Sequence, residues 1–195
     1  MTQIERQAPK ELFRDLIQEA IEHQDLDSSE TSAFYLVTLL HDFIQPQRRF
    51  EALGMAGNEA LAELFCLALT EDGPRRLPLL KLTGDTSLFL AGFFPDALSR
   101  QAPGMDYYIR MGGYAYGTAA GVSTSAAAAE VFDELAEKFG RYVDVLGEVS
   151  EKCSLLDANN LLRLYQQWQE TGSERAANLL RRAGVALMPS TARVH

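Results

Sequence analysis

Apolar residues recur every three to four positions along most of the chain, which is the spacing of one face of an α-helix. No segment alternates apolar and polar residues in the way that indicates a β-strand. Capping residues and stops at Pro or Gly then predict helices over residues 9–23, 31–45, 58–70, 83–94, 105–120, 125–152, 158–170 and 174–183. We therefore expect an all-α fold, a single-domain bundle of about seven to eight helices.

The longest expected element is a helix over about residues 125–152. Its apolar residues are spaced alternately four and three apart, which is a heptad pattern: Ala128, Phe132, Leu135, Phe139, Tyr142, Leu146, Val149 and Cys153. Three further valines (131, 143 and 145) widen the apolar face beyond a narrow seam. This pattern favours one long core helix of a bundle over a free coiled coil.

Residues 77–94 contain two apolar blocks on either side of the sequence Thr-Gly-Asp-Thr-Ser. We interpret Thr83 as the N-cap of a short helix that ends before Pro95 and whose apolar second half lies in the core. A helix N-terminus attracts anions, and Lys81 stands just before it. Asp85 would itself occupy that positive end, so simple capping is the alternative interpretation.

The helix expected over 105–120 contains an unusual number of glycines, although each costs about 1 kcal/mol relative to alanine in a helix interior. Gly113, Gly117 and Gly121 fall on one stripe of the helical wheel, and Asp106 and Arg110 extend it toward the N-terminus. A stripe without side chains allows another backbone to approach closely.

Two interpretations of this stripe remain open. In the first, it receives a neighbouring helix, such as residues 88–94 with Gly92, or a helix of another subunit. In the second, it is the floor of a ligand groove with tyrosine walls. The candidate ligand-binding residues are Tyr107, Arg110, Gly113, Tyr114 and Gly117, together with Lys81 and Asp85.

Few other residues are candidates for chemistry. His41 and Asp42 are adjacent on a helix, an arrangement found in metal-dependent hydrolases, but no further ligand is singled out by the sequence. Cys66 and Cys153 lie in apolar helical patterns, so we expect buried, reduced thiols. The chain has no nucleophile elbow, phosphate loop or CxxC motif, which favours a binding role over catalysis and predicts no metal and no cofactor.

Charge and composition narrow the choice of partner. The formal net charge of −9 opposes binding to nucleic acid or to an anionic membrane. No apolar run approaches the length of a membrane-spanning helix, and no secretory signal precedes the first helix, so we expect a cytoplasmic protein.

These observations predict one domain over residues 1–184 and a frayed tail over 185–195. The expected function is a protein-interaction or regulatory module that binds a protein partner or self-associates as a homodimer. The alternative is a protein or enzyme that binds a small acidic ligand beside the Gly/Tyr helix. A metal-dependent hydrolase that uses His41 and Asp42 is the most remote alternative.

Overall fold

The computed structural model describes residues 4–44, 58–95, 98, 104–152 and 173–174. Within these ranges the chain forms α-helices and no strand, which confirms the all-α helical bundle. Backbone contacts divide the chain into two units, residues 1–149 and 150–195, and the account below concerns the first. Most of the second unit lies outside the described residues, as do the predicted helix at 158–170 and all but the first residue of the one at 174–183. The expected domain boundaries therefore stay a prediction.

The helices are α1 (Ile4–His23), α2 (Glu30–Ile44), α4 (Asn58–Thr70), α5 (Arg76–Phe93), α7 (Met105–Val122), α8 (Ala126–Glu137) and α9 (Phe139–Lys152). None of these helices is long and apolar enough to cross a membrane. The first begins at Ile4, earlier than the start at Pro9 that the sequence suggested.

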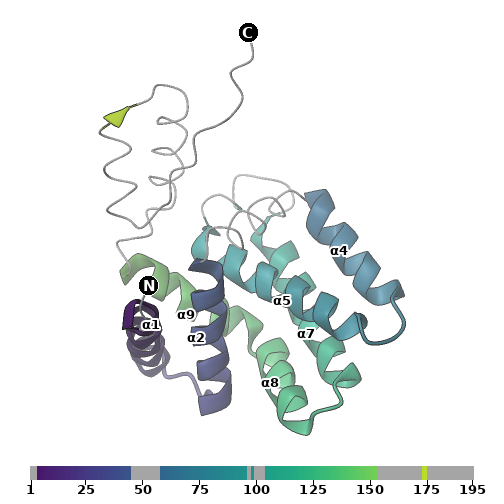
Figure 1. Cartoon of the computed structure of the whole chain (residues 1–195), viewed down its shortest axis with the longest axis horizontal. Coiled ribbons are helices and arrows are strands. Elements are labelled where there is room, and N and C mark those ends of the chain that lie inside the picture. Colours follow the sequence, from purple (N-terminus) through teal and green to yellow (C-terminus); the bar gives the residue numbers. More distant parts are fainter. Residues whose placement is uncertain (1–3, 45–57, 96–97, 99–103, 153–172, 175–195) are drawn as a thin grey trace. The chain divides into compact units, whose positions relative to one another are not determined.

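Helix α5 is the centre of the bundle. It lies between α2 and α4, and α7 packs along it (Figure 1). Every residue from Thr83 to Phe94 is buried, and the expectation of core burial for the apolar second half is confirmed. Two glycines permit this close packing. A Cβ at Gly84 would lie 2.5 Å from the Tyr116 ring, and a Cβ at Gly92 would lie 2.5 Å from the Cβ of Leu146.

The prediction of a helix start at Thr83 is wrong, because α5 runs unbroken from Arg76 to Phe93. The Thr83 hydroxyl does not cap a helix; it donates to the carbonyl of Leu79 one turn earlier, at 2.9 Å. Thr83 and Gly84 are poor helix formers, and they are small residues on a surface that other helices cover. Simple capping by Thr83 and the anion site weighed against it both required a helix N-terminus there, and α5 has none at that position.

The prediction of one long helix over 125–152 is wrong as well. Helix α8 ends at Glu137 and α9 begins at Phe139, with Lys138 between them at φ −102° and ψ 19°. The heptad positions from Phe132 to Val149 are still buried, because each helix presents its own part of the stripe to the core. The start at Ser125 is confirmed, since its hydroxyl accepts the N–H of Ala128.

Cys66 is exposed, which contradicts the buried thiol that its apolar setting suggested. Helix α4 buries only one side: Leu61 and Ala68 are in the core, while Leu67 is 48% exposed. Apolar residues lie on most sides of α4, but the other described helices cover only one of these sides. Cys66 lies on an uncovered side. Cys153 lies outside the described residues.

Candidate functional site

The residues predicted to form a site on the Gly/Tyr helix line a groove between α7 and the α8–α9 pair. This groove, which we call the α7–α8 groove, encloses about 750 Å³. Arg110, Gly113, Tyr114 and Gly117 line it from α7. The opposite side is formed by Ala136, Glu137, Phe139 and Gly140.

A second groove lies on the other side of the same helix, between α4 and α7. This α4–α7 groove encloses about 660 Å³ and is lined by Tyr107, Arg110 and Tyr114. Phe65 and Cys66 line it from α4. Five of the seven predicted site residues therefore lie on two adjoining grooves.

Arg110 and Tyr114 belong to both grooves and form the ridge between them, which we call the Arg110–Tyr114 ridge. The Tyr114 side chain is 63% exposed, and Phe65 supports it edge-to-face at 5.7 Å between ring centroids. Arg110 is exposed and makes no ion pair with any residue of the described part of the chain. The ridge thus presents an aromatic ring and a cation to solvent.

The helix beside the glycine stripe is α8, at ordinary contact distances, and not the 88–94 segment suggested as its neighbour. A Cβ at Gly113 would lie 3.6 Å from the Ala136 carbonyl oxygen, and one at Gly117 would lie 3.7 Å from the Ala136 Cβ; both are ordinary contact distances. A Cβ at Gly121 would meet nothing within 4 Å. The proposed partner, Gly92, packs against α9 instead.

The close approach on α7 belongs to the neighbouring glycine, Gly112. A Cβ there would lie 2.2 Å from the Phe139 ring and 2.7 Å from the Cβ of Ser87. Gly112 therefore cannot carry a side chain without displacing two packed helices. Gly113 and Gly117 can, and a side chain there would instead fill part of the α7–α8 groove.

Lys81 and Asp85 do not line either groove; they meet each other in a separate cluster. Lys81 Nζ lies 2.5 Å from Asp85 Oδ2, which is the contact expected of residues one helical turn apart. Asp85 Oδ1 accepts two tyrosine hydroxyls, from Tyr35 of α2 at 2.5 Å and from Tyr116 of α7 at 2.7 Å. The Lys81 ammonium also lies 5.0 Å from the centroid of the Tyr35 ring.

This Asp85 cluster satisfies a buried carboxylate with donors from three helices. Burial and the nearby Asp85 carboxylate raise the pKa of Tyr35 and of Tyr116 above the ordinary value, so both hydroxyls stay protonated and can donate. Phe132 stacks on Tyr116 at 5.9 Å and meets Tyr35 edge-on at 6.0 Å, which closes the cluster on the side of α8. The arrangement stabilises the bundle, because each polar group finds its partner within the chain.

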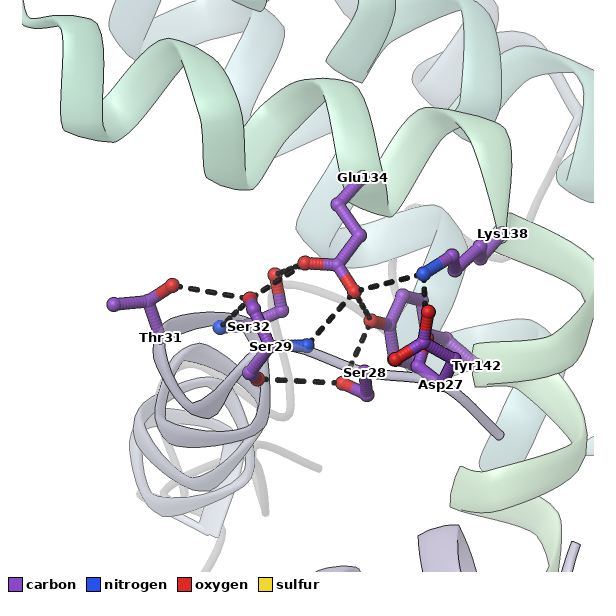
Figure 2. Close-up of polar contacts among 8 residues, drawn as sticks. All are labelled: Asp27, Ser28, Ser29, Thr31, Ser32, Glu134, Lys138 and Tyr142. Atoms are coloured by element: carbon purple, nitrogen blue, oxygen red, sulfur yellow. Dashed lines mark hydrogen bonds and ion pairs between the residues drawn. The ribbon is translucent and has the colours of Figure 1, made fainter. Parts of the chain in front are cut away.

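A second polar cluster, shown in Figure 2, joins the turn before α2 to α8 and α9. Glu134 is its centre. One carboxylate oxygen accepts the hydroxyls of Ser29 at 2.5 Å and Ser32 at 2.6 Å. The other accepts the Ser29 N–H at 3.0 Å and the Tyr142 hydroxyl at 2.9 Å, and Lys138 Nζ lies 3.2 Å away.

The pKa of Glu134 reflects this environment. Burial alone would raise the pKa, but the hydrogen bonds from Ser29, Ser32 and Tyr142 outweigh it and lower the pKa to about 2. The same contacts satisfy the N-terminus of α2: Ser29 accepts the Ser32 N–H at 3.1 Å, and its own N–H is taken by Glu134. In a capping box the latter acceptor is a Glu three residues into the same helix.

Glu30 does not form such a capping box, because it is the first helical residue, and Glu134 of α8 accepts the Ser29 N–H instead. The sequence held one signal for this cluster, the run Ser28-Ser29-Glu30-Thr31-Ser32, which is rich in hydroxyls. Nothing in the sequence identified Glu134 as their acceptor, since 102 positions separate it from Ser32.

The remaining candidate pair gains no further ligand. His41 Nδ1 lies 3.7 Å from Asp42 Oδ1, and Asp42 is largely exposed. Across the described ranges, no group of three His, Cys, Asp or Glu residues is placed to hold a metal ion.

Comparison with protein-family models, with curated proteins and with solved structures finds no match for this chain.

Proposed function

We propose that this protein is a protein-interaction module and that it binds its partner through the Arg110–Tyr114 ridge and the two grooves beside it. The observation that carries the proposal is the exposure of Tyr114, which is 63% exposed although it is large and partly apolar. Tyrosine and arginine are over-represented among the residues that contribute most to protein–protein binding. Here the two residue types are neighbours on one helix face.

The shape of the surface supports a protein as the partner. Both grooves are lined in part by exposed residues, among them Arg110 and Tyr114, so a bound group would remain in contact with solvent. Most small-molecule sites enclose their ligand. An open groove beside the exposed Tyr114 ring can receive side chains that project from the surface of another protein.

The chemistry of the lining indicates what those side chains are. An apolar or aromatic side chain suits the α7–α8 groove, whose lining includes Gly113, Gly117 and Ala136. A carboxylate suits Arg110, which has no acidic partner in the described part of the chain. We include a cytoplasmic location in the proposal, because a reduced thiol such as Cys66 persists there.

A comparison of matched variants tests the proposal. Wild-type protein, Tyr114→Ala and Phe34→Ala are immobilised and used to capture proteins from a cell extract, and a captured protein is then purified and titrated against each. Phe34 of α2 is the control, because it is equally exposed at 65% and lies outside both grooves. We expect the dissociation constant to rise about tenfold or more in Tyr114→Ala and to stay unchanged in Phe34→Ala. Equal binding by all three proteins would refute the proposal.

A small acidic ligand is the second candidate, and the meeting of Tyr107, Arg110 and Tyr114 in the α4–α7 groove favours it. Thermal denaturation with a panel of acidic metabolites distinguishes a small acidic ligand from a protein partner. A rise in melting temperature that is lost in Arg110→Ala would favour this candidate.

A further inference from the structure

We infer that the partner is a second copy of this chain, paired about a two-fold axis through the α7–α8 groove and the Arg110–Tyr114 ridge. This inference rests on the proposed function, because it names the occupant of the same surface. In a two-fold interface a residue i meets j of the other copy while j meets i, so one patch must carry both halves of every contact. The patch on α7 and α8 carries two such pairs.

The first pair is a projection and a recess. Tyr114 projects into solvent, supported by Phe65 on one side only. The α7–α8 groove adjoins it, and Gly113 and Gly117 leave the α7 side of this groove without side chains. Placing Tyr114 of each copy in the groove of the other would bury both rings against Gly113, Gly117 and Ala136.

The second pair is a cation and an anion. Arg110 and Glu137 line the same groove from α7 and from α8, and both are exposed. No ion pair within 4.0 Å joins them, and neither makes one elsewhere in the residues that the structure describes. Across a two-fold axis, Arg110 of each copy would meet Glu137 of the other, which gives two ion pairs.

Charge also favours a second copy over a basic partner. Asp106 lies one turn before Arg110 and lines the α4–α7 groove, so the patch carries both signs of charge close together. A uniformly acidic partner would be repelled by Asp106 and Glu137, and a uniformly basic one would be repelled by Arg110. A second copy instead offers Glu137 to Arg110 and Arg110 to Glu137, so its charges are complementary at both of these positions.

A charge-swap experiment tests this pairing. Sedimentation equilibrium is measured on the full chain from about 1 µM to about 1 mM, the range in which weak dimers assemble. We expect the wild type to dimerise, and Tyr114→Ala, Arg110→Glu and Glu137→Arg each to raise the dimer dissociation constant at least tenfold. Phe34→Ala is the control and should dimerise as the wild type does.

The decisive sample is an equimolar mixture of Arg110→Glu and Glu137→Arg. Each variant alone would oppose like charges across the axis, whereas the mixed dimer pairs opposite charges at both positions. We expect the mixture to regain dimers, because Arg110 and Glu137 face each other across the proposed axis.

Two results would overturn the inference. One is a wild type that stays monomeric throughout the concentration range; the other is a dimer that none of the three variants weakens. Neither result refutes the proposed function, because capture of another protein that depends on Tyr114 would still support an interaction module. Failure of both experiments would remove the function as well.

Discussion

The inner and outer sides of α7 place the same residue types in opposite situations. Tyr116 on the inner side is fully buried and donates to Asp85, whereas Tyr114 two positions earlier is 63% exposed. Gly112 lies against Phe139 so closely that a Cβ would be 2.2 Å from its ring, whereas Gly113 leaves ordinary contact distances. Helix α8 repeats the contrast, since Glu134 accepts several hydrogen bonds and Glu137 lines the open groove.

This comparison shows that residue type does not say whether a side chain serves the fold or a partner. What differs is whether the chain itself satisfies the group. A buried polar group without a partner costs about 1–3 kcal/mol, and the inner groups Tyr116 and Glu134 are both paired within the chain. Exposed groups carry no such cost, and they remain available to another molecule. In each pair of like residues, a substitution of the inner one therefore tests the fold, and the same substitution of the outer one is its control.

The largest effect is expected at the adjacent glycines. Gly112→Ala should lower the free energy of unfolding by about 3 kcal/mol, because its methyl group would overlap the Phe139 ring and Ser87. Gly113→Ala should be neutral or slightly stabilising. Urea denaturation of the two variants measures the difference, and equal losses would contradict the assignment of Gly112 to the inner side.

The second largest difference in stability is expected between Tyr116→Phe and Tyr114→Phe. Tyr116→Phe removes one of the two hydroxyls that donate to the buried Asp85, and we expect a loss of about 2 kcal/mol in the free energy of unfolding. Tyr114→Phe should change it by less than about 0.5 kcal/mol, as is usual at exposed positions. The same denaturation measurement applies, and a costly Tyr114→Phe would show that the ridge serves the fold.

The two glutamates provide a test that depends on pH. Glu134→Gln should cost about 1.5 kcal/mol at neutral pH, because a carboxylate that accepts several donors is replaced by an amide. The pKa of Glu134 is lowered from 4.5 to about 2 in the folded protein. Its contribution is therefore complete above the unfolded pKa and is lost as the pH falls from about 4.5 toward 2.

The difference in stability between wild type and Glu134→Gln should accordingly shrink as the pH is lowered through this window. Glu137→Gln is the control and should leave the stability unchanged at each pH. Denaturation series at pH values from neutral to acidic measure both, and a difference that grows in acid would mean that Glu134 is not held as a carboxylate.

The smallest effect has the opposite sign. Gly117→Ala should raise the free energy of unfolding by about 0.5–1 kcal/mol, because alanine is the better helix former and its methyl group lies 3.7 Å from the Ala136 Cβ. The same methyl group narrows the α7–α8 groove and should weaken dimer formation. Thermal denaturation measures the stability of the variant, and sedimentation of the same sample measures its dimer formation. A stabilised variant that still dimerises as the wild type does would show that the groove takes no part in the dimer.

Much of the site could be predicted because it lies on single helices. Arg110, Gly113, Tyr114 and Gly117 share one face of α7 by helical spacing alone, and Lys81 meets Asp85 for the same reason. Apolar patterning likewise predicted the burial of residues 88–93 in the second half of α5. These inferences use distances of one or two turns, which the geometry of a helix determines.

Contacts between helices could not be predicted in this way. The break at Lys138 left the heptad pattern intact, and the exposure of Cys66 depends on how little of α4 its neighbours cover. The acceptor for Ser29 lies on α8, 105 positions away in the sequence. No local pattern records which distant residue will complete a hydrogen bond.

The sequence by itself therefore determined the helical class of the described residues and the residues that each helix face carries. Only the tertiary structure decided that Gly112, rather than Gly113 or Gly117, lies at the close contact, and that Asp85 and Glu134 are satisfied by other helices. The physical reason is that helix periodicity is a property of consecutive peptide units. Packing depends instead on which surfaces exclude water together, and that choice involves the whole bundle at once.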